Sequence, residues 1–149
     1  MTANAQSMAT SFKQDLLNGV HAFSASYRAQ DTFNAALYTT NQGLGAGTTA
    51  YSATGEVSGT GYTAGGVAVT FGTPPANANG VAYVTPSANI VFNNVTLSTA
   101  FDAVLIYNNT AAGKNAVSVH TFGAQTITAG TLTLTMPSND SNNALLRLA

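Results

Sequence analysis

Residues 131–136 read TLTLTM, and this short stretch decides the fold class. Leu132, Leu134 and Met136 alternate with threonines, which is the two-residue period of a β-strand that buries one face. Threonine suits the other face because its branched Cβ packs well on a pleated surface. Residues 117–122 show a similar alternation, so the C-terminal third is predicted to be β-structure.

Outward from this stretch, several other segments have the pattern of short strands bounded by turn residues. They are residues 33–38, 67–71, 80–85, 89–92, 103–108 and 144–148, separated by turn signals such as 93–94, 112–114 and 138–140. The segment AVLIYN at 103–108 is the most apolar and is predicted to be buried on both faces. Seven to nine strands without intervening helices predict an all-β fold, an antiparallel β-sandwich or jelly roll, and exclude a parallel α/β sheet.

Residues 44–66 differ from these strands because glycine and threonine dominate and large apolar side chains are few. We interpret this segment as a long excursion with short edge strands around Tyr51 and Tyr62. Its glycines at 59–61 and 65–66 are expected to permit turns, because neither a lysine nor a helix follows them as a phosphate-binding loop requires.

The N-terminal thirty residues have a helical rather than a β period. Residues 7–18 are predicted to form an amphipathic helix of about three turns that ends at Gly19. Such a short helix is marginal alone, so its apolar stripe needs a partner surface. That surface is either its own domain or a neighbouring subunit, and Phe12 and Leu16 are the candidate docking residues. The predicted organisation is a helix and arm over 1–30 and a β-sandwich domain over 31–149.

The composition limits the function classes. Charged residues make up 6% of the 149 residues, against about 25% in an average soluble protein, and the net charge is −1. Such a chain builds no field that attracts nucleic acid, and no apolar run is long enough for a membrane span. The chain has no cysteine, which excludes disulfides and thiolate metal sites. Without a secretion signal the protein is expected to stay in the cytoplasm, and its low charge favours burial in an assembly.

Catalytic chemistry is not expected. The acids are widely scattered, so a carboxylate pair is not predicted, and the two histidines lack the adjacent acids of a metal site. A Ser-His-Asp arrangement of His120 and Asp102 exists on paper, but no G-x-S-x-G elbow supports it. We interpret His120 as a sheet-surface or interface histidine and His21 as a packing or capping residue. No enzyme activity, cofactor or metal is predicted.

Two further features carry hypotheses. Asp102 stands at the head of the most apolar strand, where a carboxylate needs a hydrogen-bond partner. The candidates are a turn amide, Arg147 or Arg28, and the functional alternative is a salt bridge between subunits.

Tyr51, Tyr62 and Tyr83 lie in loop-rich regions and could line a carbohydrate groove, although core and rim packing explains them as well.

Four stretches resemble small virion proteins of tailed bacteriophages. They are SFKQDLLNGVHAF at 11–23, TTAYSATGEVSGTGYTAGGVAVT at 48–70, TPSANIVFNNVTLSTAFDAVLIYNN at 85–109 and AVSVHTFGAQTITAGTLTLTMP at 116–137. The resemblance covers nearly the whole chain and implies virion membership more firmly than a position in the virion. It carries over no catalytic residue.

The resemblance implies a structural protein assembled in the bacterial host cytoplasm. The first hypothesis is a capsid decoration or cement protein, expected as a homotrimer, which stabilises the head by binding the major capsid protein and copies of itself. The alternative is a tail or fibre component that binds a host glycan or receptor. A virion-borne hydrolase is the third possibility, and the scattered titratable residues argue against it.

Overall fold

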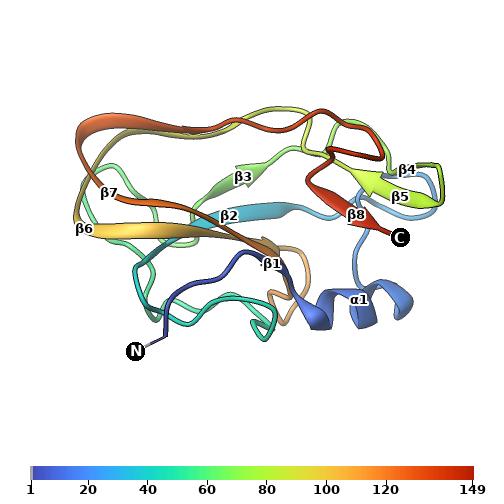
Figure 1. Ribbon diagram of the computed structural model, residues 1–149, viewed down its shortest axis with the longest axis horizontal. Coiled ribbons are helices and arrows are strands. Elements are labelled where there is room, and N and C mark those ends of the chain that lie inside the picture. Colours follow the sequence, from blue (N-terminus) through green and yellow to red (C-terminus); the bar gives the residue numbers. More distant parts are fainter. Residues whose placement is uncertain (1) are drawn as a thin grey trace.

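The computed structural model describes residues 2–149, and nearly all of its regular secondary structure is β-strand (Figure 1). The strands of this part of the chain are β1 (Ser7–Met8), β2 (Phe33–Thr39), β3 (Val67–Val69), β4 (Ala76–Ala78), β5 (Val81–Val84), β6 (Ile90–Asn108), β7 (Ala116–Leu134) and β8 (Leu146–Leu148). A single helix, α1 (Thr10–Leu17), lies below them.

The strands form two antiparallel sheets around a common core. The larger sheet has the order β1-β7-β6-β2-β3, and the smaller has the order β4-β5-β8. The predicted all-β antiparallel sandwich with a short N-terminal helix is confirmed, whereas the jelly-roll topology is not. Ala9, Phe12 and Phe23, from the expected helix and arm at 1–30, belong to the same hydrophobic core as the strands.

The longest elements are β6 and β7, each of 19 residues, which pair along their length as one hairpin. In Figure 1 this hairpin curls at the left and returns above the rest of the sheet. The prediction of separate strands at 89–92 and 103–108 with a turn at 93–94 is therefore wrong. Asn94 does adopt a positive φ of 49°, but as part of a β-bulge, after which pairing resumes at Val95.

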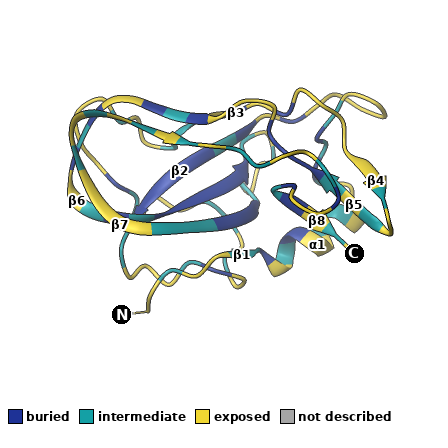
Figure 2. Cartoon of the chain, turned by 45° about the horizontal axis from the view of Figure 1, so that its top comes forward, coloured by how far each residue is buried: buried dark blue, intermediate teal, exposed yellow. Residues whose placement is uncertain are grey.

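Burial differs along the hairpin, as Figure 2 shows. β6 residues 103–108 are all buried, as predicted from their apolar sequence, because β2 and β7 flank them and other segments cover both faces. Residues 130–134 of β7 instead alternate between half-buried and exposed side chains. The alternation recognised at 131–136 is thus that of a strand with one face in the core.

The excursion at 44–66 contains no strand, so the edge strands predicted around Tyr51 and Tyr62 are wrong. Isolated bridges hold it instead, with Ala50 opposite Asn115, Glu56 opposite Tyr38, and Thr60 opposite Thr96. At its end, Gly66 has a φ of +80° and lies so close to the backbone of Ala35 that a Cβ atom would overlap it. The glycines allow a close approach that larger residues would prevent.

The helix is shorter than the predicted segment 7–18. It begins only at Thr10 because Ser7 and Met8 instead pair with the start of β7. Its predicted end at Gly19 is confirmed. Gly19 has a φ of +72° and donates its N–H to Leu16 O at 3.1 Å, while the next N–H, of Val20, reaches Asp15 O at 2.9 Å. These two bonds form a Schellman motif, which satisfies the last carbonyls of the helix.

Candidate docking site

Phe12, one of the predicted docking residues, points into the domain. Its side chain is 2% exposed and meets the ring of His21 edge-on at 4.9 Å between centroids. The ring of Phe23 lies 5.9 Å away. The helix therefore uses Phe12 to pack on its own domain, which is one of the two alternatives left open by the sequence, and the buried ring also forms part of the wall of an apolar cavity.

Leu16, the second predicted docking residue, is half-buried at a cleft between α1 and the small sheet. With Met8, Phe12 and Phe23 it lines one side of an apolar cavity of about 100 Å³. The other wall comes from the small sheet and the loop before it, through Pro75, Ala82, Tyr83, Val84, Leu146 and Leu148. The cavity exists because no side chain of the described residues fills the angle between the helix and this sheet.

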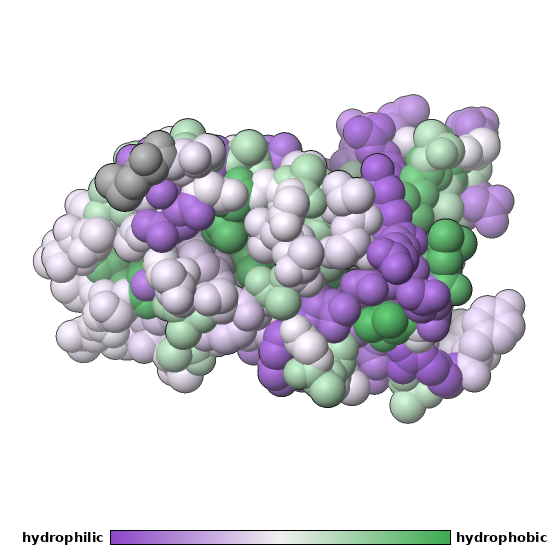
Figure 3. Space-filling view, turned by 90° about the horizontal axis from the view of Figure 1, so that it is seen from below, coloured by the Kyte–Doolittle hydropathy of each residue, from purple (hydrophilic) through white to green (hydrophobic). Residues whose placement is uncertain are grey.

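A wider hollow of about 640 Å³ adjoins this cavity and shares Leu16, Phe23 and Pro75 with it. It extends to Tyr27 and Arg28 in the loop after the helix. We call the cavity and the hollow together the docking groove. Figure 3, seen from below, shows hydrophobic residues that reach the surface at this end of the molecule.

Of the two most exposed large hydrophobic side chains of the described chain, Tyr27 lines this groove and Leu17 is adjacent in sequence to Leu16, which also lines it. Leu17 follows Leu16 on the helix and is 91% exposed, and Tyr27 is fully exposed. Single exposed apolar residues are ordinary, but two beside one apolar groove make a patch suited to a partner surface. Arg28 is the one charged side chain that lines the groove.

Arg28 is neutralised by the buried carboxylate of Asp31. Its guanidinium donates to both carboxylate oxygens, at 2.8 and 3.0 Å. Asp31 also accepts bonds from the Ala22 N–H and from Asn108 Nδ2, each at 2.8 Å. Burial alone would raise the pKa of Asp31, but these hydrogen bonds outweigh it and hold the pKa below its ordinary value. The loop that carries Tyr27 is thereby anchored to β6.

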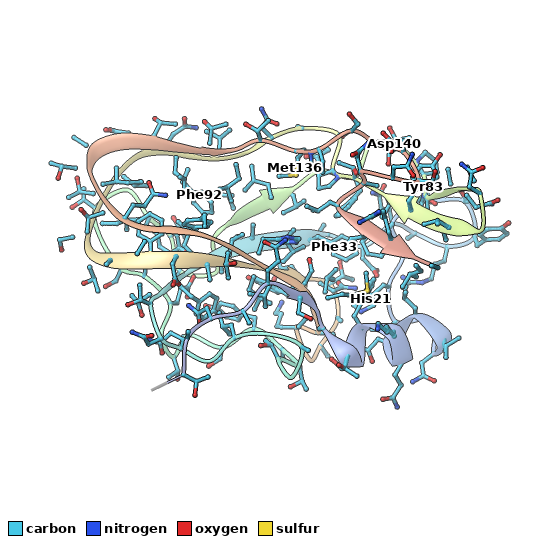
Figure 4. The ribbon with its side chains drawn as sticks, viewed as in Figure 1. His21, Phe33, Tyr83, Phe92, Met136 and Asp140 are labelled. Atoms are coloured by element: carbon cyan, nitrogen blue, oxygen red, sulfur yellow. The ribbon has the colours of Figure 1, made fainter. Side chains whose placement is uncertain are left out.

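His21 lies beneath this anchor, between α1 and the large sheet (Figure 4). Its Nδ1 lies 3.1 Å from Asn108 Nδ2, and its buried Nε2 has no hydrogen-bond partner, lying 3.7 Å from Asp15 Oδ2. Burial lowers the pKa of His21, against the opposing attraction of Asp15 and Asp31. A neutral ring stacked among phenylalanines matches the predicted packing role.

The tyrosines considered for glycan binding are mostly engaged inside the domain. Tyr51 and Tyr62 donate their hydroxyls to the carboxylate of Glu56 at 2.6 and 2.7 Å, and the Gly65 N–H donates to the same carboxylate at 2.7 Å. This cluster fixes the excursion to the sheet. Tyr83 instead lines the docking groove.

The Ser-His-Asp arrangement considered on paper is not assembled. His120 Nε2 is 2.8 Å from Ser118 Oγ, and burial lowers the pKa of His120 to about 4. The Asp102 carboxylate accepts a hydrogen bond from Asn4 Nδ2 at 2.7 Å. Its predicted partners were therefore wrong, because Arg28 bonds to Asp31 and Arg147 donates to the Asn142 carbonyl.

Within residues 2–149, no three His, Asp or Glu side chains lie close enough together to hold a metal ion. No helix in this part of the chain is long and apolar enough to span a membrane. Comparison of the chain with protein-family models, curated proteins and solved structures finds no match.

The sequence predicted parts of the docking groove but not their assembly. The helical spacing identified Leu16, and the strands predicted at 80–85 and 144–148 are confirmed as β5 and β8, but nothing in the sequence showed that these strands face the helix. Pro75 signalled only the end of a strand, and β4, which follows it, was not predicted. For Tyr27, the surrounding small polar residues were the available signal of an exposed loop.

Proposed function

We propose that the protein is a structural component of a tailed-phage virion, a capsid decoration or cement protein that binds the major capsid protein and copies of itself. The observation that carries the proposal is the docking groove, an apolar surface with Leu17 and Tyr27 exposed beside it. A chain with 6% charged residues has few other means to hold a partner.

The groove suits a permanent contact more than a transient one. The cavity of the groove is lined almost entirely by apolar side chains, whereas the hollow also presents Ser24, Ser26 and Arg28, and the charge of Arg28 is already paired with Asp31. A partner can therefore cover it without leaving a buried charge unpaired, which is the main cost of closing an interface. Tyr27 is exposed in the free chain, and an aromatic side chain that a partner covers at the centre of an interface contributes disproportionately to binding.

The rigid base of the groove supports the same role. Phe12, Phe23, Phe33 and Phe71 pack in one aromatic cluster, with Phe23 and Phe33 stacked 4.5 Å apart. Such a base is preformed, so little conformational entropy is lost when the groove is covered. A cement protein needs this property because it stabilises a shell only by the free energy of its contacts.

The test compares phage particles that carry and lack the protein. We expect particles without it to lose integrity at a lower temperature. Purified Leu17→Ser/Tyr27→Ser protein should rebind such particles at least about tenfold more weakly than wild type. Gln14→Ser, on an exposed part of the same helix, is the matched control and should rebind normally.

Equal thermal stability of particles with and without the protein would overturn the cement role. Copy number then separates head from tail: a decoration protein occurs in proportion to the capsid lattice, whereas a tail or fibre component occurs in few copies per particle. A low copy number would support the tail or fibre alternative.

A further inference from the structure

The free edges of the two sheets are not equally protected. β3, β4 and β8 are edge strands of three residues each; Pro74 and Pro75 precede β4, and β8 carries Arg147. Short length, proline and charge are the usual devices that stop edge strands from pairing with other chains. β1 covers β7 only at Ser118 and Val119.

Beyond Val119, β7 pairs with β6 on one side and with no described strand on the other. Four register shifts interrupt the pairing of its outer part with β6, but residues 132–134 pair regularly with Ile90, Val91 and Phe92. A register shift separates Leu132 from Gly130, but its extra residue lies on β6 between Phe92 and Val95, so residues 130–134 of β7 themselves run as continuous strand of ordinary length. Along the outer part of β7, no charged side chain blocks this edge: residues 115–139 contain no Lys, Arg, Asp or Glu.

The side chains of this edge are arranged to continue a sheet. Thr131 and Thr133 are exposed on the outer face, while Leu132 and Leu134 are half-buried toward the core. A hollow of about 290 Å³, lined by Leu134, Met136, Ile106 and Phe122 among others, adjoins the same edge. An added strand would bond to the free main-chain groups of β7 and lie over the mouth of this hollow.

We infer that residues 130–134 of β7 pair antiparallel with the same residues of a second copy of the chain. When a strand pairs antiparallel with the same strand of a second copy, its side chains lie close to those of the identical segment. A charged residue in the strand would then lie close to a like charge, and this edge has no charged residue. The pairing brings Thr131 of one copy opposite Thr133 of the other on the same face of the sheet, and paired threonines are favourable. The inference deepens the proposed function, on which it rests, by naming the surface through which copies meet.

The experiment measures the mass of the full chain by analytical ultracentrifugation over a range of protein concentrations. We expect a monomer–dimer equilibrium for wild type. Thr131→Lys/Thr133→Lys should weaken the dimer by about tenfold or more, because both new charges face their counterparts across the pair. Thr73→Lys, an exposed loop threonine, is the matched control and should leave the equilibrium unchanged.

A second measurement uses the absence of cysteine in the natural chain. Thr131→Cys, Thr133→Cys and their equimolar mixture are oxidised, and at least one sample should form a disulfide-linked dimer faster than Thr73→Cys. Wild type that stays monomeric at millimolar concentration, or dimers that the lysines do not weaken, would overturn the inference. Particle binding, measured separately, distinguishes this failure from a failure of the proposed function: monomers that still decorate particles overturn only the self-pairing.

Discussion

The β6–β7 hairpin places the same two strands in two environments. Its core half, β6 residues 101–108 with β7 residues 116–121, is flanked by β2 and covered on both faces. Its ribbon half, β6 residues 90–97 with β7 residues 127–134, has one face in the core and a free edge along β7. The core half should therefore carry the stability of the domain, while the ribbon half is available for contacts with other molecules.

The polar residues of the two halves differ for the same reason. The core half buries Asn108 and Ser118, and each has a specific partner. The ribbon half carries threonines that face solvent and need none. Burial on both faces requires each polar group to be satisfied within the chain, whereas a one-sided strand leaves that to water or to a second strand.

The largest expected effect comes from truncating one leucine to alanine in each half of the hairpin and comparing the loss of stability. Leu105→Ala, in the core half at 0% exposure, should lower the free energy of unfolding by about 3–4 kcal/mol, because the cavity cannot collapse. Leu132→Ala, in the half-buried ribbon, should cost only about 1 kcal/mol because less of its surface leaves water on folding. Urea unfolding measures both. Equal losses would mean that the two halves are one cooperative layer without this difference.

The next effect is a pH dependence that arises at the margin of the core half. Burial lowers the pKa of His120 to about 4, from an ordinary 6.5. The unfolded chain therefore binds more protons between these values, so the stability due to the neutral ring is complete above pH 6.5 and is lost as the pH falls toward 4. We expect a loss of roughly 2–3 kcal/mol, measured by urea unfolding at each pH.

His120→Gln is the control for this pH profile. It should flatten the profile between pH 4 and 6.5 without abolishing it, because burial lowers the pKa of His21 as well. A profile that His120→Gln leaves unchanged would show that the ring of His120 is hydrated in the folded protein.

A smaller effect concerns the excursion at 44–66, which packs over the core half through Tyr51. Glu56 accepts hydrogen bonds from Tyr51, Tyr62 and the Gly65 N–H, and Tyr51 stacks on Tyr107 of β6 at 4.7 Å. Glu56→Gln replaces a charged acceptor with an amide whose NH₂ meets donors, so it should cost about 2 kcal/mol. Amide hydrogen exchange should locate the loosening at residues 50–66. Exchange that rises uniformly over the domain would contradict this local role.

The sequence predicted strands from two different signals. The strand at 33–38 and the stretches of β7 within 117–122 and 131–136 were found from the two-residue period of their side chains, whereas 103–108 in β6 was found from its continuous apolar run. The continuity of β6 was missed because Asn93 and Asn94 have the same local signature in a bulge as in a turn. Only the partner strand, which resumes pairing at Val95, distinguishes the two.

The candidate site was predictable only in part, for a related reason. Helical spacing identified Phe12 and Leu16 as apolar, but not which of them the domain would bury. Which residue is buried depends on Phe23, in the loop after the helix, and on Leu146, in β8. Both meet the helix only after the chain has folded. The partner of Asp102 was missed because Asn4 lies 98 positions away in a segment without any periodic pattern.

The smallest expected effect tests the junction of the two halves, where Asp102 lies within the register shift between Phe101 and Ala103 of β6. Asn4 Nδ2 donates to Asp102 Oδ1 at 2.7 Å and to the Thr39 carbonyl at 3.0 Å, so the N-terminal segment is tied to this junction. Asp102→Ala removes one of the two acceptors and should cost about 1 kcal/mol, because the amide keeps the other. Asp102→Asn retains an oxygen acceptor and should cost less.

A double-mutant cycle with Asn4→Ala, measured by urea unfolding, isolates the pair, and its coupling energy should be about 0.5–1 kcal/mol. Zero coupling would make Asp102 a solvated surface acid, and the junction would then be held by the main-chain pairing of β6 with β2 and β7 alone.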